Sequence, residues 1–360
     1  MSTVTFDGDR LAELQEQRPE HPWGRRTTSF RTVVTLAVIL PAVVITLLFW
    51  FSSIPAPVIM VAIYLPLQVI AAAIAAIILR GRKAAGDAVI VVCAIGASIF
   101  SVVVLASLLW SIVSQGLKAM RGSFIFQNNE YISPSTPLEY GGVGHAIIGT
   151  VLIVAIATLV AVPIGIATAV YITEVRGRAV PIVRFFVQAM SGVPSVVAGL
   201  FILTVFILTG VLQQSAFAAG LAYAILMLPT VARTAEEVLR LVPEDLRTGA
   251  LALGSTRARV VMKVVIPAAK TGIITATILG IARVVGETAP LLLTALKNDK
   301  TVVLPFSDPI SALPTYIFSN VAQPYPDAVT RAWGAALTLM VIVAILFTLT
   351  RTLSSKRPGR

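Results

Sequence analysis

The chain has 360 residues, of which 57% are hydrophobic and 12% are charged, so its composition excludes an ordinary soluble domain and indicates a polytopic membrane protein. Its formal net charge of +11 comes mostly from short basic segments next to apolar runs. No basic stripe interleaved with aromatic residues is present, which excludes nucleic acid as a partner. Cys93 is the only cysteine, so intrachain disulfides and cysteine-based metal sites are excluded.

The N-terminal region reads as a cytoplasmic tail, residues 1–32, followed by an additional pair of membrane spans in residues 33–84. Residues 1–29 are polar and charged and contain no short apolar region before a cleavage site, so we expect an uncleaved tail. The role of the additional pair does not follow from the residues.

About eight apolar runs are long enough, at ~20 residues, to cross a bilayer. They lie at residues 33–51, 55–79, 88–115, 144–172, 195–212, 216–232, 268–296 and 332–350. Because backbone polar groups in lipid must be satisfied within each segment, the predicted fold class is all-α, with about eight transmembrane helices.

Basic residues in the short segments set the predicted orientation of the chain. They precede the first span, follow the second and the fourth, and end the chain in a tail at residues 351–360: Arg25, Arg26, Arg31, Arg80, Arg82, Lys83, Arg176, Arg178, Arg351, Lys356, Arg357 and Arg360. Both termini are therefore predicted to be cytoplasmic. The two longest outward segments, 116–143 and 297–331, are rich in Asn, Pro, Tyr and Gly and suit irregular docking loops.

Glycine and proline interrupt the entry to the fifth predicted span in "SGVPSVVAGLF", residues 191–201. Gly192 and Pro194 are the predicted hinge, and the amphipathic "PIVRFFVQAM" before them can lie along the membrane interface. The alternative is a simply kinked span.

The longest cytoplasmic segment, residues 233–267, is predicted to form a helical hairpin. Gly254 is placed to stop a first helix. Ser255 or Thr256 can cap a second helix, which Pro267 breaks.

Arg283 and Glu287 stand in the otherwise apolar run 268–296, where each charge costs at least ~2.5 to 3.5 kcal/mol at bilayer depth. At a spacing of i, i+4 they are predicted to share a helix face with the small residues Gly280 and Pro290. Two interpretations stay open: a structural ion pair, or part of a polar pathway. The predicted hinge and packing residues are Gly192, Pro194, Gly280, Gly286 and Pro290.

No enzyme signature is present, since the sequence lacks a phosphate-binding loop, a paired-histidine zinc motif, a cysteine and histidine ligand set and a serine-centred elbow. His21 and His145 are isolated and are interpreted as polar boundary residues. We therefore predict no catalytic residue, no metal site and no cofactor in this chain.

Several motifs resemble those of the membrane permease subunits of bacterial ABC importers, and among them the phosphate-specific permeases. "GALALGSTRARVVMKVVIP" resembles the EAA loop, with its glycine at Gly254 and its Ile-Pro end at Pro267. "GGVGHAIIGT", "SGVPSVVAGLF", "LPTVARTAEEVLRLVP" and "ARVVGETAPLLLTA" are similar to phosphate-permease motifs, and "GETAP" is typical of the A-type subunit. The resemblance covers residues 85–350.

The resemblance implies a type I importer (MetI-like) permease in a bacterial cell membrane, multi-pass and surrounded by lipid. It implies a homologous permease partner (PstC-like), ATP-binding subunits (PstB-like), which carry ATP and Mg, and an extracytoplasmic phosphate-binding protein (PstS-like). In that arrangement the ATPase is contacted or positioned by five residues of the hairpin: Ala250, Leu251, Leu253, Gly254 and Pro267.

For the substrate, we expect Arg283 and Arg233 to attract phosphate and Glu287 to prevent tight trapping. The interpretation of Arg233 as a residue that only snorkels to the interface stays open.

The sequence departs from the family pattern at Thr248, which stands where the EAA motif has its glutamate. A salt bridge from that position to the ATPase is therefore not assumed. Three alternatives for the whole protein remain: a permease for another anion or small solute, a membrane-embedded enzyme, and a non-transporting sensor.

Overall fold

The computed structural model describes residues 28–51, 59–175 and 177–355, and every α- or π-helical element below lies in these ranges. The chain divides into two compact units between Leu108 and Leu109, a point inside helix α5 (Lys83–Ala119). The predicted tails lie largely outside the described residues.

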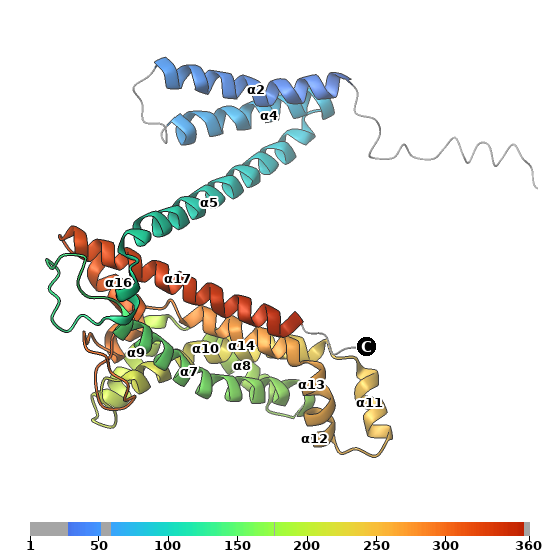
Figure 1. Ribbon diagram of the computed structural model, residues 1–360. Helices are drawn as coiled ribbons and strands as arrows, with labels where there is room; N and C mark the ends of the chain where they lie inside the picture. The colour runs from blue at the N-terminus through green and yellow to red at the C-terminus, as the bar shows by residue number, and fades with distance from the viewer. Residues whose placement is uncertain (1–27, 52–58, 176, 356–360) are drawn as a thin grey trace, which may run out of the picture. The chain divides into compact units, whose positions relative to one another are not determined.

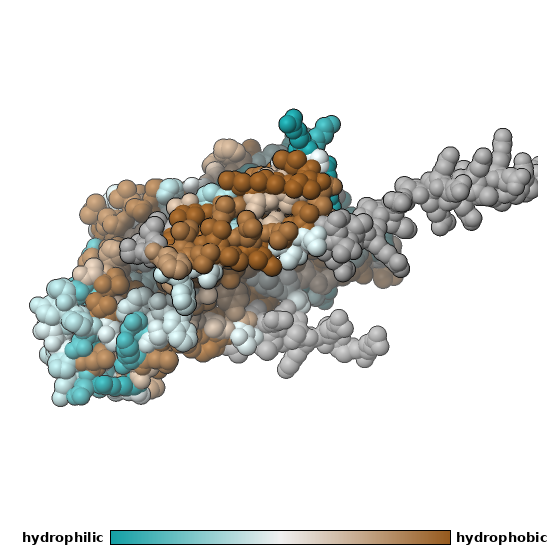
Figure 2. All heavy atoms as spheres, turned by 90° about the horizontal axis from the view of Figure 1, so that it is seen from above, coloured by the Kyte–Doolittle hydropathy of each residue, from teal (hydrophilic) through white to brown (hydrophobic). Residues whose placement is uncertain are grey.

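The first unit contains α2 (Thr28–Phe51), η1 (Ile59–Tyr64), α4 (Leu65–Arg80) and the first part of α5. The Gln68 amide donates to the Ala37 carbonyl at 3.3 Å, which joins α4 to α2. Large hydrophobic side chains are exposed along all three helices, and the face in Figure 2 is rich in hydrophobic residues (brown). Exposed apolar surface of this kind suits helices that face lipid.

The second unit contains the rest of the chain from Leu109. Its elements are α6 (Gly122–Phe126), α7 (Gly144–Val170), η2 (Tyr171–Val175), α8 (Val180–Ser191), α9 (Ser195–Ile202), η3 (Leu203–Ile207), α10 (Ala216–Arg240), α11 (Glu244–Ala252), α12 (Arg257–Val260), η4 (Val261–Val265), α13 (Ile266–Ala268), α14 (Lys270–Val284), α15 (Ala289–Thr294), α16 (Leu313–Val321) and α17 (Pro326–Ser355).

Six helices of the described residues are long and apolar enough to cross a membrane, and up to eight spans result if each of two bent pairs counts as one. One pair, α8 with α9 and η3, bends by 102°, and the other bends by 72° where α14 begins. The predicted all-α fold with about eight spans is confirmed.

The predicted continuous helix over residues 268–296 is wrong. Helix α14 ends at Val284, and α15 begins only at Ala289. Pro290 has no N–H to donate to the carbonyl of Gly286, so an uninterrupted helix would lose a hydrogen bond there, and proline is instead accommodated in the first turn of a new helix.

Helices α7 and α10 form the core of the second unit. The buried face of α7 carries a small residue at every fourth position from Ala157 to Ala169 and another at Gly149, with Ile153 between them. A Cβ on Gly165 would lie 3.0 Å from a Val231 methyl of α10, so the glycine permits close approach of the two backbones.

Helices α7, α10, α14 and α17 run along one another in Figure 1, and α11 with α12 stands beyond one end of them. We call this end the hairpin end. We call the opposite end, where residues 120–143 and 295–312 connect the helices, the loop end.

Candidate functional site

Arg283 lies in the last turn of α14, next to α10. Its Nη1 donates to Thr230 Oγ1 at 2.9 Å, and its side chain is otherwise exposed. One turn earlier Gly280 is buried, and a Cβ there would lie 2.7 Å from Val231 Cγ2. The glycine thus lets α14 approach α10 closely enough for Arg283 to reach Thr230.

Glu287 lies outside α14, in the break before α15. Its N–H donates to the Val284 carbonyl at 3.0 Å, and its own carbonyl accepts from the buried Tyr223 hydroxyl. None of the ion pairs among the described residues joins Glu287 to Arg283. The expected shared helix face is therefore wrong, because the helix ends between the two residues.

A polar stripe runs along the last three turns of α10 and ends at the hairpin end. At about 100° per residue its members fall within an arc of about 120°: Thr230, Arg233, Glu236, Glu237 and Arg240. The structure thus places Arg233 one turn from the hydroxyl that holds Arg283. Both predicted pathway arginines contact or belong to the same stripe.

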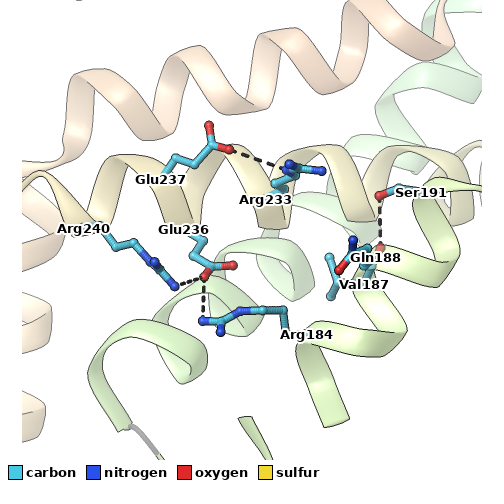
Figure 3. A pocket seen from close by; sticks show the side chains of 8 residues that line it. All are labelled: Arg184, Val187, Gln188, Ser191, Arg233, Glu236, Glu237 and Arg240. Atoms are coloured by element: carbon cyan, nitrogen blue, oxygen red, sulfur yellow. Dashed lines mark hydrogen bonds and ion pairs between the residues drawn. The ribbon is translucent and has the colours of Figure 1, made fainter. Parts of the chain in front are cut away.

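A pocket of about 320 Å³ lies between this stripe and α8 (Figure 3). Arg184 of α8 and Arg240 of α10 point to the same carboxylate, Glu236, and Arg184 Nη2 lies 2.9 Å from Glu236 Oε1. Arg233 Nε lies 3.5 Å from Glu237 Oε1. Sequence reasoning missed Arg184, although it is the one charge within the amphipathic segment before the hinge.

The hairpin is anchored to the end of the α7 span by a second ion pair that sequence reasoning missed. Arg247 Nη2 of α11 lies 2.9 Å from Glu174 Oε1 of η2, and both side chains are about nine-tenths buried. The guanidinium also donates to the carbonyls of Leu239 and Val242 at the end of α10. Nothing in the sequence pairs two charges 73 positions apart.

The turn of the hairpin follows the sequence prediction. Gly254 has φ +81°, a conformation that favours glycine, and Thr256 Oγ1 caps α12 by accepting from the Arg259 N–H. Leu251 is 42% exposed and Leu253 is 89% exposed, so both present apolar surface outward.

The other two predicted coupling residues, Ala250 and Pro267, do not lie at the exposed turn of the hairpin. Ala250 is half-buried and packs against a cluster of buried apolar residues at the hairpin end, which includes Leu239, Val242 and Val260. Pro267 lies in α13, and the 72° bend follows at Ala269, so the chain turns two residues later than predicted. Thr248 is exposed, and its hydroxyl donates to the Glu244 carbonyl at 3.2 Å.

The predicted hinge and packing residues separate into two groups. Gly192 and Pro194 lie at the 102° bend, and a Cβ on Gly286 would meet nothing within 4 Å. Pro290 is buried, and a Cβ on Gly199 of α9 would lie 2.6 Å from its Cα. Gly199 is thus a close-packing residue that the sequence analysis did not single out.

Buried polar side chains hold the loop end together. Asn129 Nδ2 donates to the Tyr316 hydroxyl at 2.8 Å, and burial raises the pKa of Tyr316 to about 12. His145, the second residue of α7, lies at the end of the span as predicted, but it is 1% exposed and packs edge-on against Tyr316. The described residues contain no group of three or more potential metal ligands.

Two further contacts fix the segments that connect the helices at the loop end. Arg331 of α17 is 2% exposed and donates to the carbonyls of Thr136, Pro137 and Tyr140. On the surface, Lys300 Nζ lies 3.0 Å from Glu130 Oε1. The hydrogen bond between them lowers the pKa of Glu130 and raises that of Lys300.

Comparison with known proteins decides the family. The family described as "Binding-protein-dependent transport system inner membrane component" matches residues 161–357, more than half of the chain. The chain belongs to this family. It is therefore a multi-pass inner membrane component of a transporter, a permease and not a catalytic subunit.

Among the relatives of this chain, phosphate transport system permease protein PstA 1 of Mycobacterium tuberculosis (strain ATCC 25618 / H37Rv) is 39% identical over 250 residues, which cover 69% of this chain and 80% of that protein. PstA of Mycobacterium leprae is 43% identical over 210 residues, covering 58% and 69%. PstA of Haemophilus influenzae is 36% identical over 262 residues, covering 71% and 90%.

A chain of the solved structure "Inward facing conformations of the MetNI methionine ABC transporter: CY5 native crystal form" aligns with a TM-score of 0.47 at 17% identity. The alignment covers 59% of this permease and 93% of that chain.

Proposed function

We propose that this permease translocates inorganic phosphate into the cytoplasm as one subunit of an ATP-driven importer. The relatives that carry the name phosphate transport system permease support the substrate. The observation that carries the proposal is the environment of Arg283, which a hydroxyl holds in place instead of a carboxylate.

The chemistry of Arg283 suits a passing oxyanion. A guanidinium has five N–H donors in a planar fork that matches phosphate oxygens. One donor contacts Thr230, and none of the ion pairs among the described residues neutralises the charge. Arg283 therefore keeps both charge and donors available for a phosphate oxygen.

Release requires that the attraction stay weak, since conduction demands binding that is favourable enough to enter and weak enough to leave. Glu287 lies four positions beyond Arg283, half-buried in the break before α15. Its carboxylate repels an anion that lingers near the end of α14. Arg233, one turn further along α10, takes over the attraction toward the hairpin end.

The hairpin end is the cytoplasmic end in this proposal, because the short segments there are rich in Arg and Lys. It follows that both termini are cytoplasmic. The exposed Leu251 and Leu253 dock in a cleft on an ATPase subunit, and the buried pair of Arg247 and Glu174 transmits the motion to α7. A homologous permease and an extracytoplasmic phosphate-binding protein complete the importer.

The deciding experiment is ATP-dependent uptake of labelled phosphate into vesicles that contain this chain with its permease partner, ATPase and binding protein, with and without excess sulfate. Uptake that requires ATP and ignores sulfate supports a phosphate importer. An assembled complex that hydrolyses ATP but takes up no phosphate would remove phosphate as the substrate and leave the family assignment intact.

A further inference from the structure

The pocket between α8 and α10 carries a net positive charge. Its side chains include three arginines and two glutamates, a formal balance of 3 − 2 = +1. A single carboxylate, Glu236, accepts from both Arg184 and Arg240. Arg184 joins α8 to α10, whereas Arg240 pairs with Glu236 within α10, so two guanidinium groups share one carboxylate.

The arginines also have unused hydrogen-bonding capacity. Among the contacts of the described residues, Arg184 and Arg240 each use one Nη2 donor, and Arg233 makes a single ion pair at 3.5 Å. The side chains of the three arginines are 46 to 67% exposed. All three arginines line the same pocket, and Figure 3 shows Arg184 and Arg240 converging on Glu236 while Arg233 is directed toward Glu237. Several N–H donors from two helices can therefore reach one ligand.

Guanidinium groups favour tetrahedral oxyanions, because their N–H pairs match two oxygens at once. Chloride offers no such geometry. The two glutamates keep the pocket near neutrality when it is empty and so limit its affinity. A site of about 320 Å³ accommodates phosphate together with part of its hydration shell.

The location of the pocket gives the site a place in transport. It lies along the part of the polar stripe nearest the hairpin end, and the stripe begins at Thr230, the partner of Arg283. We infer that Arg184, Arg233 and Arg240 form a low-affinity exit subsite for a phosphate-class oxyanion. The inference rests on the proposed function, and its test below gives a separate answer.

Cysteine labelling tests the subsite directly, because the chain has a single natural cysteine. The probe is Gln188→Cys in a Cys93→Ser background, since Gln188 is exposed and lines the pocket. The assembled transporter in nanodiscs of zwitterionic lipid is labelled with an anionic or a cationic thiol reagent of equal size. Labelling is repeated with inorganic phosphate and with chloride at matched ionic strength.

We expect the anionic reagent to react about 10-fold faster than the cationic one, because a positive cleft concentrates anions. Inorganic phosphate should slow labelling by the anionic reagent, and chloride should not. Arg184→Gln combined with Arg240→Gln should abolish both effects. Glu236→Gln should lower the phosphate concentration that protects, because it frees both arginines.

Two matched controls separate the pocket from general surface charge. Arg178→Gln removes one exposed positive charge from the segment before α8, outside the lining of the pocket, and should leave phosphate protection unchanged. Ser135→Cys places the probe on the exposed segment at the loop end, where phosphate should not protect. Protection that is equal at both probe positions would overturn the inference.

The phosphate group of a lipid has the same chemistry, and the exposed Phe185 and Phe186 of α8 suit the membrane interface. Nanodiscs with anionic lipid distinguish the sources. Slow labelling only in anionic lipid, without protection by free phosphate, would show headgroup binding and overturn the exit subsite. No protection in any lipid, from a complex that takes up phosphate, would also overturn the subsite but leave the proposed function standing.

Discussion

Arg283 and Glu287 are four positions apart, yet different neighbours hold them. Arg283 contacts a side chain of α10, whereas Glu287 is fixed through its backbone in a break. Because a charged hydrogen bond contributes about 1.5 to 3 kcal/mol, Arg283→Gln should lower phosphate uptake about 10-fold or more. Thr230→Val should lower it less, since it removes the support and keeps the charge. Vesicle uptake measures both.

Assembly of the transporter must be checked for each of these variants together with uptake. A charge swap, Arg283→Glu with Glu287→Arg, should not restore uptake, because the two residues form no ion pair with each other in the structure. If the swapped variant recovered transport, the interpretation as a structural ion pair would be favoured and the pathway role would be contradicted.

The buried pair of Arg247 and Glu174 leads to a second prediction. Arg247→Met leaves a buried carboxylate without its partner, a change that typically costs about 3 to 5 kcal/mol. Residues 244–268 should then show faster amide hydrogen exchange, and the ATPase should co-purify less. Arg257→Met, an exposed arginine on α12, is the matched control. Unchanged exchange in Arg247→Met would show that the hairpin is held by its apolar packing alone.

At the level of single elements, long apolar runs predicted where α7, α10 and α17 lie. Interruptions were harder to place: the hinge at Gly192 and Pro194 was predicted, but the break after Val284 was not. An apolar run indicates that a segment is buried in lipid or protein, but it does not indicate whether the backbone continues as one helix. Pro290 was a signal for the break.

The contact between α9 and α15 yields a third prediction. Gly199→Val should prevent assembly or reduce it strongly, because even a Cβ at this position would lie 2.6 Å from the Pro290 backbone. Gly286→Ala should be tolerated, since a Cβ there meets nothing within 4 Å. The yield of monodisperse complex measures both variants. A normal yield of Gly199→Val would mean that the two helices can separate without loss of the fold.

At the scale of the whole molecule, the fold class and the family motifs were accessible from sequence, and the connections between distant segments were not. Arg247 with Glu174 and Arg331 with Pro137 join positions 73 and 194 residues apart. Such pairs depend on how helices are arranged in space. The division of the chain inside α5 also has no composition signal, since the helix is apolar on both sides of Leu108.

The two connecting segments of the loop end are joined at the surface by Glu130 and Lys300, which leads to a pH prediction. The hydrogen bond from Lys300 lowers the pKa of Glu130 from its ordinary value of 4.5. The stabilisation is therefore complete above pH 4.5 and is lost as the pH falls through the lowered pKa of the folded state. Lys300→Met should remove this dependence.

The backbone N–H of Asn129 donates to the Asp299 carbonyl. Its hydrogen exchange, corrected for the intrinsic pH dependence of exchange, measures this loss of stabilisation. Lys297→Met is the control, because Lys297 pairs with Asp299 on the same surface but does not contact Glu130. An identical corrected pH profile for wild type and Lys300→Met would contradict the prediction.

The buried Arg331 also dictates an order of events during biosynthesis. The carbonyls that accept its hydrogen bonds belong to residues 136–140, which leave the ribosome nearly 200 residues earlier. Until α17 is synthesised, these carbonyls lack this donor, so the segment is missing the contact that joins it to the last helix. The loop end is thus among the last parts of the permease to be completed, and a chain truncated before Arg331 would lack the side chain that fixes residues 136–140.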